Sequence, residues 1–251
     1  MLCTECYEDS SASCINLSWM TPAIILLTAG PACAASLDFD GSLGLTTDYV
    51  YRGVSQTRNE AVAQLDVHLQ VGEHWVTGAW ASPIEPRQGE RATELDLYTH
   101  WQQYLGGGIS GSIGVTYYRF INDPRNTEYN YLEWSGELNW RERLMLSVAW
   151  SQENVLRLQG IGAFPGTETL NIELTARQPL PQELSFQIGA GYFTGVDLPD
   201  SDYVYGSSSL TRSVGPVQAT LSYHWVQDDI QRRYIPGLAA NPWALTVIWT
   251  F

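Results

Sequence analysis

Apolar and polar residues alternate with a period of two along most of the chain after Asp38. At the end of the sequence, Trp243, Leu245, Val247 and Trp249 occupy every second position, with smaller or polar residues mostly between them. No stretch of comparable length shows the 3.6-residue apolar period of an amphipathic helix. Successive side chains of a strand point to opposite faces, so this pattern predicts strands with one apolar and one polar face.

Twelve segments follow this pattern, and the connections between them alternate between short and long. Five tight turns are expected at one end of the strands, and six longer polar loops at the other. This asymmetry is typical of an outer-membrane barrel, in which short turns face the periplasm and long loops face outwards. The expected strands are 38–52, 61–71, 74–81, 92–104, 108–120, 129–140, 143–152, 167–178, 182–193, 203–214, 217–227 and 243–251; the expected loops are 53–60, 82–91, 121–128, 153–166, 194–202 and 228–242.

A soluble sandwich or lipocalin-like barrel would show the same alternation with its apolar faces turned inwards. The composition favours the opposite arrangement, in which the apolar faces point outwards to lipid. Charged residues make up only 16% of the chain, below the roughly 25% usual for soluble domains. Lys is absent, whereas the 10 Trp and 14 Tyr suit the boundary between lipid and water. The sequence therefore predicts an all-β fold, an antiparallel up-and-down transmembrane β-barrel of about 12 strands, with ten or fourteen as alternatives.

The charge balance limits the kinds of partner that the protein is expected to bind. With 13 basic residues against 27 acidic ones, the formal net charge is −14, which argues against nucleic acid as a partner. All basic residues are Arg, and several fall in or beside the expected long loops. Arg binds phosphate through two hydrogen bonds, so contact with lipopolysaccharide is one interpretation and solvated loop charge is the other. The residues concerned are Arg87, Arg91, Arg119, Arg125, Arg157, Arg232 and Arg233.

The first 35 residues are set apart from the expected barrel, which covers residues 36–251. Residues 20–35 are uncharged and mostly apolar, and they end in Ala32-Cys33-Ala34, a small-x-small pattern that signal peptidase accepts. We expect a secretory signal peptide here, although no Lys or Arg precedes the apolar run, which suggests a misplaced start. All four cysteines lie in this leader, so the barrel is expected to contain neither disulfides nor thiol chemistry.

A motif near the start of the barrel resembles a known family. The run Thr47-Asp48-Tyr49-Val50-Tyr51-Arg52-Gly53-Val54-Ser55-Gln56-Thr57 is similar to the opening signature of the proteobacterial Gcw_chp proteins, also called TorF-type porins. Thr47 stands where Ser is commoner in the family. The likeness is strongest over residues 43–98 and continues later mainly as a pattern of strands. It implies a membrane barrel without an established substrate or mechanism. The terminal Phe251 also resembles the signal that the barrel-assembly machinery reads in outer-membrane proteins.

The alternation assigns a set of charged residues to the polar, lumen-facing side. If Tyr49 and Tyr51 face lipid, Asp48 and Arg52 face the lumen, about 13 Å apart along the strand and too far to pair with each other. They would need partners on neighbouring strands, either in a structural salt-bridge network or in a binding or selectivity site. The expected lumen-lining residues are Asp48, Arg52, Asp66, His68, Glu94, Asp96, His100, Glu133, Glu137, Glu173, Arg177 and His224.

We expect no catalytic residues, metal site or cofactor. The lumen-facing histidines, together with Asp66 and Asp96, could in principle bind zinc, but their spacing carries no metal motif. Ser222 and His224 share a face of one strand without a nucleophile elbow. The glycine run 106–108 reads as a hairpin turn rather than a phosphate loop, because no Lys follows it.

These observations predict a porin in the outer membrane of a Gram-negative bacterium, surrounded by lipid and lipopolysaccharide, that lets small solutes pass passively. Seven of the lumen-facing residues are acidic and two are Arg. Such an excess of carboxylates in a narrow tube favours cations over anions. The alternatives are a structural barrel with a plugged lumen and an outer-membrane enzyme.

Overall fold

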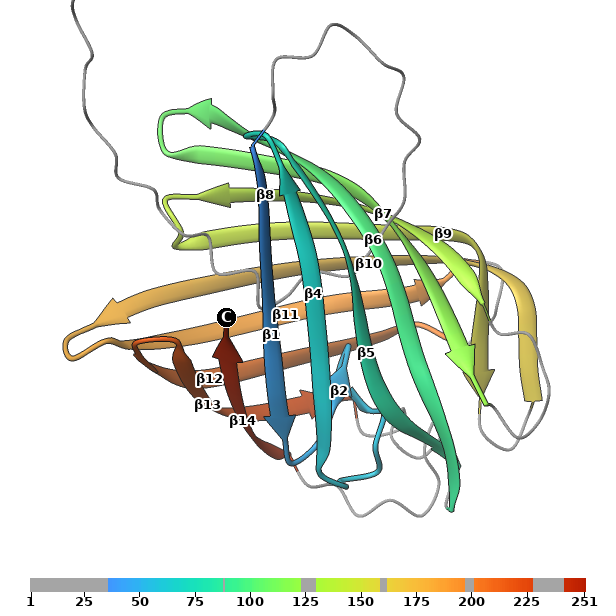
Figure 1. The fold of residues 1–251 in the computed structure, drawn as a ribbon. Helices are drawn as coiled ribbons and strands as arrows, with labels where there is room; N and C mark the ends of the chain where they lie inside the picture. The colour runs from blue at the N-terminus through green and yellow to red at the C-terminus, as the bar shows by residue number, and fades with distance from the viewer. Residues whose placement is uncertain (1–35, 88, 123–129, 159–161, 197–200, 228–241) are drawn as a thin grey trace, which may run out of the picture.

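Twelve long antiparallel strands close into a barrel in the computed structural model, which describes residues 36–87, 89–122, 130–158, 162–196, 201–227 and 242–251 (Figure 1). Each strand pairs with its neighbours in the chain, and β1 pairs with β14 to close the ring. The barrel strands are β1 (Leu37–Thr46), β4 (Val62–Val71), β5 (Trp75–Arg87), β6 (Glu90–Gly106), β7 (Ile109–Ile121), β8 (Tyr131–Trp140), β9 (Leu144–Leu158), β10 (Gly162–Leu180), β11 (Leu184–Gly195), β12 (Tyr203–Val214), β13 (Val217–Val226) and β14 (Trp243–Thr250).

Two further short strands, β2 (Val50–Tyr51) and β3 (Val54–Ser55), pair only with each other. In Figure 1 they lie within the ring of long strands. The connection from β1 to β4 is therefore only partly an outer loop. The part that contains β2 and β3 turns inwards as a small hairpin.

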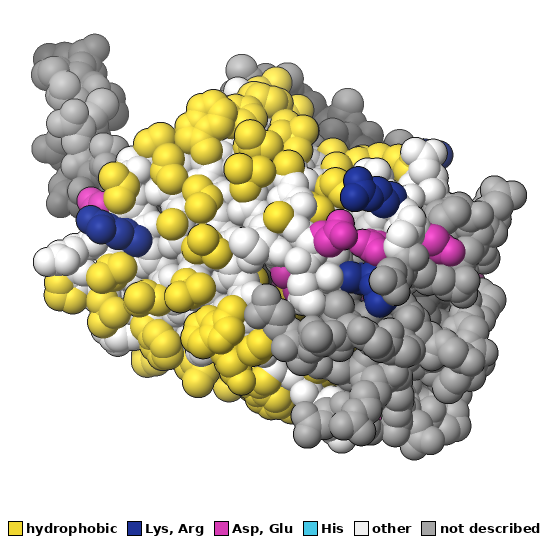
Figure 2. All heavy atoms as spheres, turned by 90° about the horizontal axis from the view of Figure 1, so that it is seen from below, with side chains coloured by type: hydrophobic (Ala, Val, Ile, Leu, Met, Phe, Trp, Pro, Cys, Tyr) yellow, Lys and Arg dark blue, Asp and Glu magenta, His cyan; other side chains and the backbone are white. Residues whose placement is uncertain are grey.

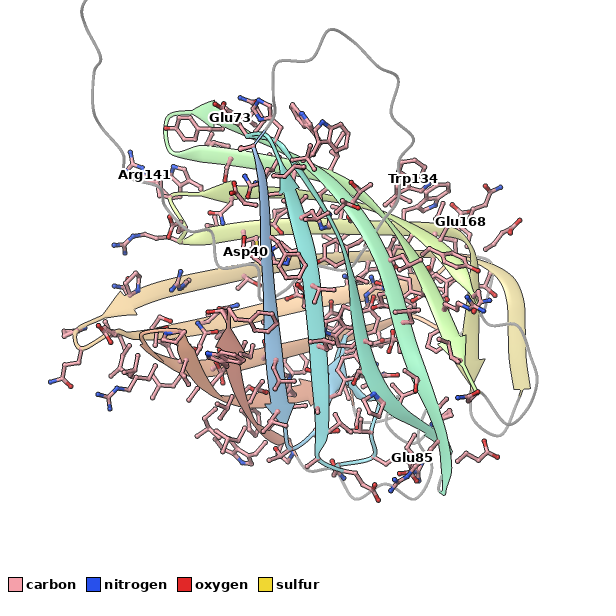
Figure 3. All side chains as sticks on the ribbon, in the orientation of Figure 1. Asp40, Glu73, Glu85, Trp134, Arg141 and Glu168 are labelled. Carbon is pink, nitrogen blue, oxygen red and sulfur yellow. The ribbon has the colours of Figure 1, made fainter. Side chains whose placement is uncertain are left out.

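The outer surface of the barrel is apolar and its inner surface is polar. On β7 and β8, Ile113 and Trp134 are 64% and 51% exposed, whereas the alternate residues Thr116 and Glu133 are 0% and 1% exposed. Trp134 points away from the wall in Figure 3, and Figure 2 shows hydrophobic side chains over much of the lower face, with charged ones gathered towards its ends. Burial of this outer surface requires lipid, so the fold is a transmembrane barrel.

The predicted strand number is confirmed, and the positions of the turns follow the prediction. Five tight connections join β4 to β5, β6 to β7, β8 to β9, β10 to β11 and β12 to β13, at one end of the barrel. Three residues form each of the connections 141–143 and 181–183. Positive backbone φ angles at Arg141 and Glu142, and again at Gln182 and Glu183, give these turns the twist that suits antiparallel strands.

Two of the predicted loops are mostly strand in the structure. The segment 153–166 was expected to be a loop, but β9 and β10 stay paired as far as Leu158 and Gly162, with a register shift near Thr167. Likewise, β5 and β6 extend over most of 82–91. The strands stay paired beyond the edge of the lipid. Outward-facing residues there contact water and need not be apolar, so the alternation fades before the strands end.

Among the described residues, no helix has the length and apolar character needed to span a membrane. The expected signal peptide and the cysteines of residues 1–35 lie outside the described part of the chain.

Candidate functional site

The inward hairpin formed by β2 and β3 has a two-residue turn, Arg52-Gly53. Val50 pairs with Ser55 and Tyr51 with Val54, so these two residues form the whole connection. Both have positive φ angles, 50° and 78°, as a type I′ turn requires. Gly53 also lies against the wall, because a Cβ atom there would come within 2.7 Å of the Tyr205 Cβ. Backbone conformation and close approach therefore both favour glycine at the tip.

Asp48 holds the base of the hairpin together. Its Oδ1 accepts hydrogen bonds from Ser55 Oγ at 2.6 Å and Thr57 Oγ1 at 2.8 Å, and from the Asn59 backbone N–H at 3.3 Å. The Thr57 hydroxyl oxygen in turn accepts from the Tyr49 N–H at 3.0 Å. Bonds to an ionised carboxylate are stronger than those between neutral groups, so Asp48 fixes the loop in its inward conformation.

At the tip, Arg52 forms an ion pair with Glu133 of β8. Its Nη2 donates to both Glu133 oxygens, at 2.8 and 2.9 Å, and the two side chains are only 9% and 1% exposed. The guanidinium also lies over the rings of Tyr51 and Phe193, at 4.6 and 5.6 Å from their centroids. Glu133 accepts a further hydrogen bond from Tyr118 at 3.3 Å. A buried pair supported in this way is costly to break by removing one partner.

Two tyrosines attach the hairpin to the wall beside this pair. Tyr49 packs edge-on against Trp80 of β5, with ring centroids 5.3 Å apart. The Tyr51 hydroxyl lies 3.1 Å from that of Tyr118 on β7. Burial, reinforced at Tyr49 by Glu94, raises the pKa of both hairpin tyrosines well above the usual value. They are therefore neutral hydrogen-bonding groups at physiological pH.

The other side of the hairpin packs on the opposite wall. Val54 contacts a buried cluster of Phe193, Tyr203, Tyr205 and Val226, from β11, β12 and β13. The Glu85 backbone N–H donates to the Gln56 carbonyl at 2.8 Å, which ties the hairpin to β5 as well. Contacts with β5, β7 and β8 on one side and with β11 to β13 on the other mean that the hairpin crosses the lumen.

Two sequence-based expectations are wrong at this point. The first strand was expected to run to Arg52 with Tyr49 and Tyr51 facing lipid, but it ends at Thr46 and both tyrosines lie inside the barrel. The segment 53–60 was expected to be an outer loop, and much of it lies in the lumen. Each arm of a short hairpin also alternates, so period two does not distinguish it from a continuing strand.

The structure brings some of the predicted lumen-lining residues together. Arg52 meets Glu133 across the lumen rather than a residue on a neighbouring strand. On β4, His68 Nδ1 lies 2.6 Å from Asp66 Oδ1, and the other Asp66 oxygen accepts a hydrogen bond from Tyr98. Asp48 and Arg52 do not contact each other, because Asp48 bonds within the hairpin.

The remaining predicted residues are distributed around the wall. Glu94, Asp96 and His100 lie on β6, and all three are buried; Glu94 and Asp96 lie beside Tyr49 of the hairpin, whereas the His100 ring packs on Tyr98. Glu173 accepts a hydrogen bond from Tyr205 at 2.7 Å. Arg177 lies 4.0 Å from Glu142 near the turn end, whereas Glu137 and His224 face inwards on β8 and β13. Within the described residues, no three His, Cys, Asp or Glu side chains are grouped so as to hold a metal ion.

Sequence reasoning missed the aromatic residues of the inner wall. Trp80, Tyr98, Tyr118 and Tyr205 all contact the hairpin or the charged residues around it. One signal was available, because Tyr98 lies two positions from Asp96 and therefore shares its face. The others could not be found, since their roles depend on a hairpin that the pattern did not reveal.

Comparisons with known proteins give a family for the chain and solved structures of similar fold. Residues 29–246 match the model of the family described as "Bacterial protein of unknown function (Gcw_chp)", so the chain belongs to this family. No curated protein sequence matches it. A chain solved in work on the in-meso crystallization of membrane proteins is similar in fold, with a TM-score of 0.52, 11% identity, and coverage of 85% of this chain and 83% of that one.

Two solved porins also align along nearly their whole length. The KdgM porin has a TM-score of 0.49 and 10% identity, with 85% of this chain and 98% of that one covered. The NanC porin has a TM-score of 0.49 and 8% identity, with the same coverage of both chains.

Proposed function

We propose that this protein is a narrow channel of the bacterial outer membrane, through which small solutes pass passively and cations pass more readily than anions. The observation that carries the proposal is the excess of carboxylates on the inner wall beside a hairpin that crosses the lumen. Among the described residues, the inward positions and the hairpin hold many more acidic residues than arginines. The acids include Asp38, Asp40, Asp48, Asp66, Glu94, Asp96, Glu133, Glu137 and Glu173, and the arginines include Arg52 and Arg177.

Both inward arginines already lie beside a carboxylate. Arg52 is bonded to Glu133, and Arg177 lies within ion-pair distance of Glu142. Their charges therefore offset little of the remaining negative potential. In a narrow passage with low-dielectric walls, this potential concentrates cations and excludes anions.

We also propose lipopolysaccharide as a neighbour of the outer surface. Arg119 is exposed on β7, close to the loop end of the strand. Arg91 is exposed at the start of β6, within 3.5 Å of Glu60. Guanidinium groups at this height suit the phosphates of a lipid headgroup.

The second candidate function is a closed structural barrel, and the hairpin itself favours it. A segment that touches walls on both sides of the lumen narrows any passage, and its buried ion pair holds it in place. An enzymatic role has less support: the Ser222 hydroxyl donates to the Ala244 carbonyl at 3.4 Å, and nothing observed activates it as a nucleophile. We therefore propose a protein without catalytic activity.

The decisive measurement is ion conduction by the refolded protein in planar bilayers. Under a KCl gradient, we expect a reversal potential of the sign for cation preference. The triple variant Asp66→Asn, Glu94→Gln and Asp96→Asn should lose most of this preference. Glu73→Gln, at an exposed turn outside the lumen, removes a carboxylate as a control and should leave it unchanged (Figure 3).

Three outcomes would count against the proposal. A zero or anion-selective reversal potential would contradict cation preference. The same conclusion would follow if the triple variant kept the parental selectivity. A correctly folded barrel that carries no current would favour the closed structural barrel.

A further inference from the structure

Three polar atoms on inward positions of β6 and β7 are buried without a hydrogen-bond partner: Asp96 Oδ1, His100 Nε2 and Thr116 Oγ1. The residues are 3%, 2% and 0% exposed. Thr116 pairs with Tyr98 in the strand register, and Tyr98 lies between Asp96 and His100 on β6. The three side chains therefore line one continuous patch of the inner wall. Buried polar atoms nearly always have a hydrogen-bond partner, so these inward-facing atoms point to a polar ligand in the lumen.

The hairpin lies over the Asp96 end of this patch. The two cross-strand neighbours of Asp96 are Trp80 on β5 and Tyr118 on β7. These are the residues on which Tyr49 and Tyr51 of the hairpin dock. The Asp96 carboxylate therefore lies on the wall between two aromatic side chains, with two tyrosines over them.

The chemistry of the patch favours a cation that donates several hydrogen bonds. An ionised carboxylate accepts only, while a hydroxyl and one nitrogen of neutral imidazole can accept. Glu94 and Glu133 lie close enough to Asp96 to repel its charge, so a cation bound beside Asp96 would relieve the repulsion between these carboxylates. Aromatic ring faces attract organic cations. A hard metal ion such as Ca²⁺ needs six to eight oxygen ligands, which this patch does not offer.

We propose that Asp96 and Thr116, with the rings of Trp80 and Tyr49, form a binding site for an organic ammonium group in the lumen, and that His100 lies at its far edge. This inference rests on the proposed channel. It identifies the cations that pass through the lumen as amine-bearing solutes. The ammonium group donates to Asp96 Oδ1 and Thr116 Oγ1, and its carbon substituent packs against the aromatic rings.

The site is tested by an NMR titration of the refolded full-length chain in detergent micelles with ethylammonium chloride. The indole N–H signal of Trp80, assigned with a Trp80→Phe variant, should shift in a saturable way. Asp96→Asn should weaken binding at least about tenfold, because it removes the central charge. Thr116→Val should weaken it a few-fold. Glu137→Gln, a matched loss of an inward carboxylate away from the patch, should change it by less than about twofold.

Several results would overturn the inference. They are the absence of a saturable shift in heat-modifiable, folded protein, an equal shift with ethanol or with KCl, and unchanged affinity in Asp96→Asn. The titration needs no ion current, so it separates the two proposals. Saturable binding in a barrel that does not conduct would support the site and contradict the channel. Conduction without saturable binding would support the channel and contradict the site.

Discussion

Arg52 and Glu133 are 81 positions apart in the sequence, yet the Arg52 Nη2 lies 2.8 Å from one carboxylate oxygen and 2.9 Å from the other. The pair joins the tip of the inward hairpin to β8. The hairpin is the part of the chain that carries the family-like motif, so the motif encodes a lumen structure rather than a segment of the wall.

Removal of the ion pair should release the hairpin. Arg52→Ala leaves Glu133 buried without its charge partner, which typically costs about 3–5 kcal/mol. We expect larger or more variable single-channel currents than in the parent protein. Arg177→Ala removes the other inward arginine near the turn end and is the matched control. Identical current traces for Arg52→Ala and the parent protein would show that the pair does not restrict the lumen.

Gly53→Ala should displace the hairpin by a steric route. The added Cβ would lie 2.7 Å from the Tyr205 Cβ, and the φ of +78° is unfavourable for alanine. Limited trypsin digestion reports the change, because the peptide bond after Arg52 becomes accessible once the hairpin leaves the wall. Gly106→Ala has a similar φ of +92° but nothing within 4 Å of the added atom. If both variants resist trypsin equally, the contact with the wall does not hold the hairpin.

Asp48→Ala should loosen the base of the hairpin without touching its tip. Three donors lose their acceptor, and each buried donor left unsatisfied costs about 1–3 kcal/mol. We expect faster hydrogen exchange at the Tyr49 and Gln56 amides, measured by mass spectrometry of peptides. Asp38→Ala, at the exposed start of β1, removes an acid without these contacts. Unchanged exchange in Asp48→Ala would mean that packing alone fixes the hairpin.

Cysteine labelling should report the orientation of the barrel. All four cysteines of the chain lie in residues 1–35, so the parent protein gives the background against which each single substitution is compared. On intact cells, a membrane-impermeant maleimide should label Gly89→Cys, between β5 and β6, but not Gly106→Cys or Gly215→Cys at the opposite end. Ser55→Cys should label poorly despite its position in an expected outer loop, because it lies in the lumen hairpin. Labelling only at Gly106 and Gly215 would reverse the topology.

The sequence alone was enough to predict twelve strands and a membrane barrel. On β7 and β14, for example, Ile113 and Trp249 face lipid at positions that the alternation marks as apolar. This succeeds because lipid on one side and water on the other act on each strand locally, so every second residue records its own environment. The absence of Lys and the abundance of Trp and Tyr also indicate a surface in contact with lipid.

Tertiary structure decided what happens inside the barrel. Asp48, Tyr49, Val50, Tyr51 and Arg52 alternate like a continuing strand, and an Arg-Gly pair is a less obvious turn signal than Asn-Gly. The chain turns inwards because Asp48 has acceptor sites for the loop, Gly53 fits against Tyr205, and Glu133 receives Arg52. Two of these partners lie far along the sequence on strands that meet only when the ring closes. A local sequence pattern does not contain contacts that form only when the barrel closes. The hairpin and the patch around Asp96 depend on such contacts, so only the structure revealed them.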